Sequence, residues 1–151
     1  MATLIQFSRN IRKRGRQVVN SGSRVVRGTA KVSLRSLVMA TPVDKGVARS
    51  NWRVGIGAPT SSVIEAYAPG KKLGINETAN ANAAIRAGNA RINAVQGVSG
   101  VGLKTAIWIS NAVPYLNKLN RGSSSQAALG FIQTALLEAQ LFIRGFRVFE
   151  R

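Results

Sequence analysis

The chain has 151 residues, the length of one ordinary domain, and 45% of them are hydrophobic. Its 22 lysines and arginines face five acids, so a net charge of +17 favours polyanionic partners, either nucleic acid or an acidic protein surface. With no histidine, no cysteine and one aspartate, it lacks the groups that most acid–base, metal and disulfide chemistry requires, and no apolar run approaches the roughly 20 residues that span a bilayer. We therefore expect one domain over 1–151, with no enzymatic activity, no cofactor and no membrane partner.

Residues 7–40 predict one long amphipathic helix, with Gly22 as a place where it could break. Small and apolar residues recur on one face at about 100° per residue: Ile11, Gly15, Val18, Gly22, Val25, Val26, Thr29, Val32, Ser36 and Ala40. Basic residues lie on the opposite face: Arg9, Lys13, Arg16, Arg24, Arg27, Lys31 and Arg35. Because residues 1–43 contain no acid, this face has two interpretations. It is a solvated surface, or it binds an anion, either DNA phosphate or an acidic protein surface.

The middle of the chain predicts strands and one further helix. Residues 51–57 and 62–67 alternate between apolar and polar, which indicates an antiparallel hairpin. An Ala/Asn-rich insertion over 68–103 contains a short surface helix from Asn76 to Val95. Residues 104–110 predict another strand. Together with the first helix, these elements indicate an α+β fold in which the long N-terminal helix packs on a small, mainly antiparallel sheet.

The C-terminal part predicts a second helix. Residues 115–119 fit either a short helix or an extended segment, and residues 122–125 form a loop. Apolar residues recur at helical spacing from Gln126 to about Ile143. Apolar residues alternate with other residues over 144–151, which is compatible with a last strand but does not require one. The prediction is therefore a C-terminal helix that adds to the sheet and the long first helix.

Two polar, turn-rich segments punctuate this pattern. The first reads T-P-V-D-K-G over 41–46 and is followed by Asn51 and Trp52. The second contains S-N-A-V-P-Y over 110–115 and L-N-R-G-S-S-S-Q-A over 119–127. Over roughly residues 35–135 the chain resembles the phage neck and tail-completion family, also described as tail-terminator or head–tail joining proteins. Lys45, Val47 and the Ala128–Leu129 pair depart from the usual pattern, but the glycine and asparagine positions fit.

The resemblance implies a structural virion protein at the neck–tail junction of a tailed phage, made in the host bacterial cytoplasm. Its copies would close into a ring around the DNA channel, joining portal or connector to tail. Sixfold is the family expectation, and twelvefold applies to connectors beside portals; DNA would pass without sequence-specific contact. The resemblance also implies that seven residues make contacts with other subunits or with partners: Asp44, Asn111, Tyr115, Asn120, Arg121, Ser124 and Gln126. For Asp44, the interpretation as a side chain that pins its own turn is favoured over the contact role.

Two other classes of function compete with this interpretation. A small basic nucleic-acid-binding protein fits the charge, although the sequence shows no helix-turn-helix, zinc or RNA-recognition signature. Trp52, Trp108 and Tyr115 could stack on bases, but both tryptophans lie in strand alternation, which favours packing. A membrane-surface binder fits poorly, because the apolar face of the first helix between Ile11 and Val32 is made of small residues and valine.

Overall fold

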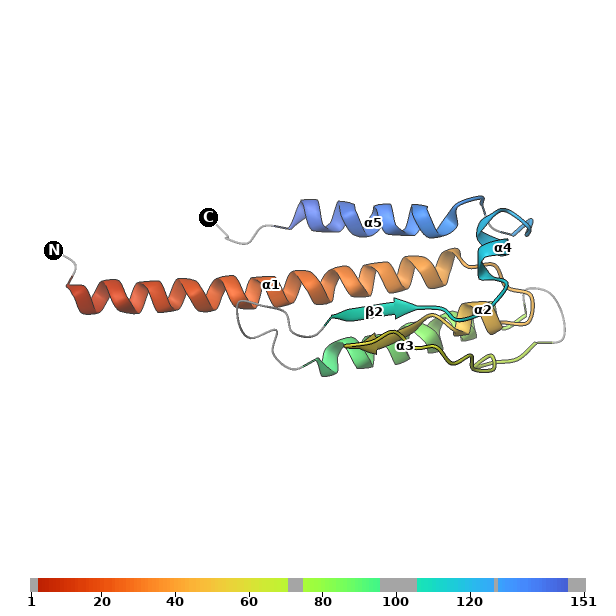
Figure 1. The fold of residues 1–151 in the computed structure, drawn as a ribbon, viewed down its shortest axis with the longest axis horizontal. Coiled ribbons are helices and arrows are strands. Elements are labelled where there is room, and N and C mark those ends of the chain that lie inside the picture. Colours follow the sequence, from red (N-terminus) through yellow and green to blue (C-terminus); the bar gives the residue numbers. More distant parts are fainter. Residues whose placement is uncertain (1–2, 71–74, 96–105, 127, 147–151) are drawn as a thin grey trace.

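In the computed structural model, residues 3–70, 75–95, 106–126 and 128–146 are described. The fold is α+β, as predicted: a long N-terminal helix packs against a two-stranded antiparallel sheet, and a C-terminal helix lies along it (Figure 1). The elements of the described part are α1 (Leu4–Ala40), α2 (Val47–Ser50), β1 (Arg53–Ile56), α3 (Glu77–Ala94), β2 (Ile107–Ser110), α4 (Leu116–Asn120) and α5 (Phe131–Gly145). In Figure 1, α5 lies on one side of α1, and the sheet and α3 lie on the other.

Helix α1 begins one turn earlier than predicted and has a projecting half and a packed half (Figure 1). Thr3 and Gln6 form a reciprocal capping box that starts it. Residues 4–18 are all exposed, and the helix continues through Gly22 without a break. We call Leu4–Gly22 the arm. Burial begins beyond it, at Ser23, Ala30, Ser33, Leu34, Leu37 and Val38.

The predicted apolar face of α1 is not the face that the fold buries. Ile11, Gly15, Val18 and Gly22 are exposed, because they lie in the arm, which projects beyond the rest of the fold. In the packed half, the buried line runs about a quarter-turn round the helix from the predicted one. Leucines that the prediction did not use, Leu34 among them, form the core with Trp52, Val54 and Ile92.

The predicted hairpin between 51–57 and 62–67 is wrong. Strand β1 pairs with β2, with Val54 opposite Ile109 and Gly55 opposite Trp108. Residues 62–66 lie beside the start of β1 but are held by side chains instead of a ladder. The Arg53 guanidinium donates to the Ser62 Oγ over 2.7 Å. The Asn51 carboxamide accepts from the Ile64 N–H and donates to the Ile64 carbonyl, each over 2.8 Å. A Cβ at Gly55 would clash with the Ala58 carbonyl oxygen, so the chain turns back too closely after β1 for a second strand to pair there.

Helix α3 has nearly its predicted bounds but is part of the core and not a surface helix. Its buried residues are Asn80, Ala81, Ala84, Gly88 and Ile92, packed against α1 and β1. Four of these five side chains are small or polar, so the sequence shows only a thin apolar stripe. A Cβ at Gly88 would overlap the Leu34 side chain, which explains how closely α1 and α3 approach.

The C-terminal elements settle two open points. Residues 116–120 are helical, as α4, and α5 begins at Phe131, five residues after the predicted start. The delay arises because Asn120 binds the entrance to α5: its side-chain oxygen accepts from the Ile132 N–H over 3.0 Å, and its carbonyl from the Gly130 N–H over 2.8 Å. Residues 147–151 of the suggested last strand, and residues 104 and 105 of the β2 prediction, lie outside the described residues.

Candidate functional site

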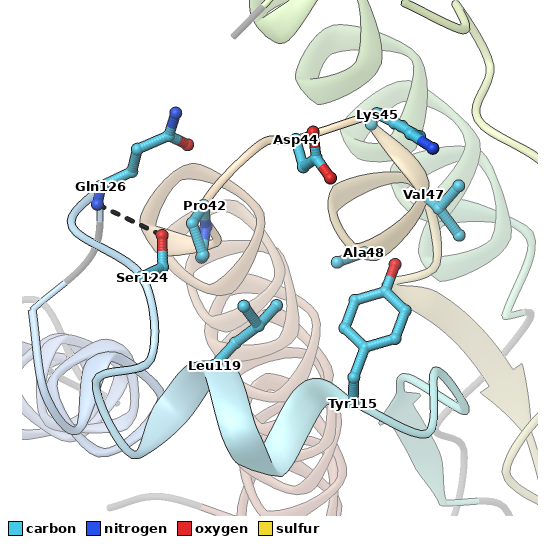
Figure 2. Close-up of a pocket in the computed structure, with 10 residues that line it drawn as sticks. Pro42, Asp44, Lys45, Val47, Ala48, Tyr115, Leu119, Ser124 and Gln126 are labelled. Atoms are coloured by element: carbon cyan, nitrogen blue, oxygen red, sulfur yellow. Dashed lines mark hydrogen bonds between the residues drawn. The ribbon is translucent and has the colours of Figure 1, made fainter. Parts of the chain in front are cut away.

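The two turn-rich segments meet at one end of the molecule, although residues 47–109 separate them in sequence. They line a cavity of about 410 Å³ beyond the C-terminal end of α1. Its walls are Pro42, Asp44, Lys45, Gly46, Val47, Ala48, Tyr115, Leu119, Ser124 and Gln126 (Figure 2). We call this region the motif end. It lies opposite the arm, at the other end of α1 (Figure 1).

The turn of the first segment is fixed by a buried arginine that sequence reasoning missed. Arg49 is 3% exposed and caps the C-terminus of α1. Its guanidinium donates to the Thr41 carbonyl oxygen over 2.9 and 2.6 Å and to that of Met39 over 3.2 Å. It also pairs with Glu77 at 2.7 Å. Because Glu77 lies 28 residues after Arg49, no local spacing of charges in the sequence indicated this ion pair.

Gly46 and Asn80 hold the same turn against α3. Gly46 has φ 84°, and a Cβ there would overlap the Asn80 carboxamide, so glycine is required on both counts. The Asn80 side chain accepts from Ser50 Oγ over 2.9 Å and from the Ala68 N–H over 2.8 Å. It also donates to the Ala68 carbonyl over 2.8 Å. Asn80 was missed because one asparagine in an Asn-rich helix carries no distinguishing signal.

Three of the predicted contact residues use their carboxamides inside the chain. Asn111 donates to the Ala48 carbonyl over 2.8 Å, which joins the second segment to α2. Gln126 accepts from the Val43 N–H over 2.9 Å, which joins it to the first segment. The Asn120 side chain binds the start of α5. These residues therefore position the motif end, and a partner would meet other groups there.

Of the remaining four predicted contact residues, three line the cavity of the motif end, and Arg121 follows α4 outside the cavity walls. Asp44, Tyr115 and Arg121 are exposed, and half-buried Ser124 accepts from the Gln126 N–H over 3.2 Å. Partial burial of the ring, and next the negative charge of Asp44, raise the pKa of Tyr115 above its usual value near 10.0. The Tyr115 phenol therefore stays a neutral hydrogen-bond donor beside an acceptor carboxylate. The arrangement suits recognition of a polar partner surface.

The predicted basic row divides between the two halves of α1. Arg9, Lys13 and Arg16 are exposed on the arm and make no hydrogen bond or ion pair with the described residues. In the packed half, Arg24 lies over the Phe146 ring at 5.9 Å, and the Arg27 Nε donates to the Ser23 carbonyl over 3.4 Å. Lys31 is half-buried and Arg35 exposed. The arm also carries exposed Arg12 and Arg14, so it holds the densest free charge that the structure describes.

The described ranges also bear on two further features, a metal site and a membrane-spanning helix. Within them, no group of three or more His, Cys, Asp or Glu side chains is placed to hold a metal ion. No helix in this part of the chain has the length and apolar character needed to cross a membrane. Comparison of the chain with protein-family models, with curated proteins and with solved structures finds no match.

Proposed function

We propose that this protein is a structural component of the neck of a tailed phage, without enzymatic activity. Its copies form a ring that joins the portal or connector to the tail around the DNA channel. One observation carries the proposal: the two segments that resemble the neck and tail-completion family line one cavity at the motif end. Two segments that lie far apart in the sequence thus form a single surface.

The shape of the molecule supports a ring. Its two ends differ: the motif end presents Asp44 and Tyr115, and the other end is a projecting arm with five exposed basic residues. Contacts between unlike surfaces repeat from copy to copy and close into a ring when the rotation permits. In such a ring, a basic surface near the channel would screen the charge of passing DNA, and one beside a connector would bind an acidic rim.

The test is the mass of the nuclease-treated protein by light scattering, with electron microscopy of the same sample. Closed rings of one size support the proposal and give the stoichiometry, with sixfold expected. Asp44→Lys should abolish the rings, because it reverses the charge beside Tyr115. Glu65→Lys makes the same change at an exposed residue outside the cavity and should leave them intact. A protein that stays monomeric alone and with its connector contradicts the proposal.

A second candidate function, a small basic nucleic-acid-binding protein, draws support from the arm. Four exposed basic residues lie in one sector of a projecting helix with no acid and provide a row of phosphate contacts without base specificity: Arg9, Arg12, Lys13 and Arg16. A monomer that binds duplex DNA more tightly as salt falls would favour this function over the ring. Reversing Arg24, Arg27 and Lys31 to Glu is the sequence-based test of the basic face. Because Arg24 and Arg27 also contact the fold, Arg9, Lys13 and Arg16 make the cleaner set.

A further inference from the structure

The arm carries an apolar stripe that nothing in the described chain covers. Leu4 is 87% exposed, Phe7 62%, Ile11 54% and Val18 48%. Their spacings of three, four and seven place them on one face of the helix. Large apolar side chains gathered on one line of a projecting helix mark a contact surface and not a solvated one.

An apolar groove continues this stripe along the packed half of α1. It has a volume of about 410 Å³ and is lined by Val25, Val26 and Thr29 of α1, Ile107 and Ile109 of β2, and Ile143 of α5. At about 100° per residue, Val25 and Thr29 share the face of Ile11 and Val18. The Thr29 Oγ1 is buried and has no hydrogen-bond partner in the described part of the chain. No residue in the described part of the chain fills this groove.

The arm cannot fill the groove of its own chain. Helix α1 is continuous from Leu4 to Ala40, so the arm and the groove lie end to end on one rigid element. Folding the arm back would need a break in the helix, and the structure has none between them. An arm that enters such a groove must come from another molecule.

Two glycines on the stripe face indicate that a helix approaches closely there. Gly15 and Gly22 lie in the helix interior, where glycine is less stable than alanine. A Cβ at either position would have nothing within 4 Å, whereas Gly28 is covered by Phe142 and Gly88 by Leu34. The described part of the chain therefore gives no steric reason for glycine at 15 and 22. A neighbouring backbone seated on the stripe would supply one.

The exposed area leaves room for such a contact. The chain exposes 10395 Å², whereas a compact monomer of 16.1 kDa is expected to expose about 7,400 Å². The difference, about 3,000 Å², exceeds severalfold the roughly 800 Å² that each partner buries in a standard interface. This surplus area is therefore enough for a full interface, even if part of it belongs to residues outside the described ranges.

We propose that the groove binds the arm of a second copy of this chain. The stripe and the groove match in chemistry: both are apolar, and none of the described residues that line the groove is charged. Arg9, Lys13 and Arg16 lie on the opposite side of the arm and stay in water when the stripe is covered. Arg14 lies at the edge of the stripe, where its long stem can follow the surface and its guanidinium reach solvent.

The test places a photoreactive benzoylphenylalanine at Phe7 in the full chain. After irradiation, cross-linked peptides between two copies are mapped by mass spectrometry. The expected acceptors are peptides that contain Val26, Ile107 or Ile143, and Val26→Arg in the acceptor chain should reduce the yield at least fivefold. Circular dichroism confirms that this variant is folded. Benzoylphenylalanine at Tyr67, an aromatic residue with 44% exposure away from the groove, is the matched control and should give no groove cross-link.

The outcomes separate this inference from the proposed function, on which it does not depend. Closed rings whose Phe7 probe reacts outside the groove overturn the arm contact and leave the neck function standing. Groove cross-links in an assembly that stops at two copies support the arm contact and overturn the ring. A Phe7 probe that yields no cross-link between copies at concentrations where the protein self-associates also overturns the arm contact.

Discussion

The Trp52 indole N–H donates to the Thr41 Oγ1 over 2.6 Å, and that hydroxyl in turn donates to the Leu37 carbonyl oxygen over 2.6 Å. Thr41 is 0% exposed and Trp52 5%. One hydroxyl therefore joins the C-terminus of α1 to the residue that precedes β1. This contact gives a structural reason for the threonine of T-P-V-D-K-G and for the tryptophan that follows it.

Replacing Thr41 by valine should lower the free energy of unfolding by about 1–3 kcal/mol. Valine keeps the shape but leaves the buried Trp52 N–H without its acceptor, and an unsatisfied buried donor costs about that much. Urea denaturation followed by tryptophan fluorescence measures the change. Thr134→Val removes a hydroxyl that is exposed on α5 and should change stability by less than about 0.5 kcal/mol. Equal losses in the two variants would contradict the role of Thr41.

Two glycines of α1 should respond oppositely to alanine. Gly28→Ala should destabilise the protein by about 1–3 kcal/mol, because the new methyl group overlaps the Phe142 ring that packs α5 on α1. Gly22→Ala meets open space in the single chain and should raise the helix content of the monomer, since alanine is favoured by about 1 kcal/mol inside helices. Urea denaturation and circular dichroism at low protein concentration report the two effects.

Adding Phe142→Leu to Gly28→Ala supplies the control for that pair. The smaller side chain frees space at the ring position, so the double variant should recover part of the stability that Gly28→Ala loses, beyond the sum of the two single changes. Strict additivity would show that the glycine and the ring do not interact. If Gly22→Ala leaves self-association unchanged, the close approach at the arm is also wrong.

The sequence predicted well those elements whose signals are local. The N-terminal helix, the helix over 77–94 and the strand over 107–110 follow from periodicity and turn residues within their own segments. The partner of β1 did not, because strand pairing across 50 residues leaves no local trace. The alternation in 62–67 resembled a strand, but the Asn51 and Arg53 side chains hold that segment without a backbone ladder. The burial of α3 was hidden because Ala81, Ala84 and Gly88 pack by being small.

The candidate site was predictable in composition but not in arrangement. The two segments stood out by their turn residues, yet only the fold shows that they share a cavity. Polar side chains such as Asn111 and Gln126 look alike in sequence whether they bind a neighbour or their own backbone. Here they bind the backbone. The exposure of Leu4 and Phe7 was equally invisible, because it depends on where the rest of the chain stops covering α1.

The motif end should lose stability at high pH through Tyr115. Its folded-state pKa is raised by burial and by the Asp44 charge, so the folded protein keeps the phenol proton where the unfolded chain has released it. This contribution is fully present below pH 10.0 and is lost as pH rises through the folded-state pKa. Tyr115→Phe should therefore flatten the fall of unfolding free energy above pH 10.0. Asp44→Asn should flatten it less, because burial is the larger cause.

Urea denaturation on both sides of pH 10.0 checks this expectation, and absorbance of the tyrosinate gives the pKa directly. A Tyr67→Phe background leaves Tyr115 as the single tyrosine, since the chain has two. Asp44→Asn in that background should lower the observed pKa. An unchanged pKa would show that the Asp44 carboxylate does not act on the phenol, and the polar surface at the motif end would need another explanation.

The arm should carry most of any binding to duplex DNA. Changing Arg9, Lys13 and Arg16 to Gln should reduce the slope of log affinity against log salt concentration by about 3, because each phosphate contact contributes about 0.9. Fluorescence anisotropy of a labelled duplex over a salt series measures the slope. Arg86, Arg91 and Arg121 are also exposed but lie off the arm, so changing them to Gln removes equal charge and should leave the slope nearly unchanged. Equal reductions in both variants would mean that net charge, and not a projecting basic helix, governs the attraction. A reduction confined to the arm variant would locate the phosphate contacts on the face opposite the apolar stripe. One helix could then bind a polyanion on one face and a second copy of the chain on the other.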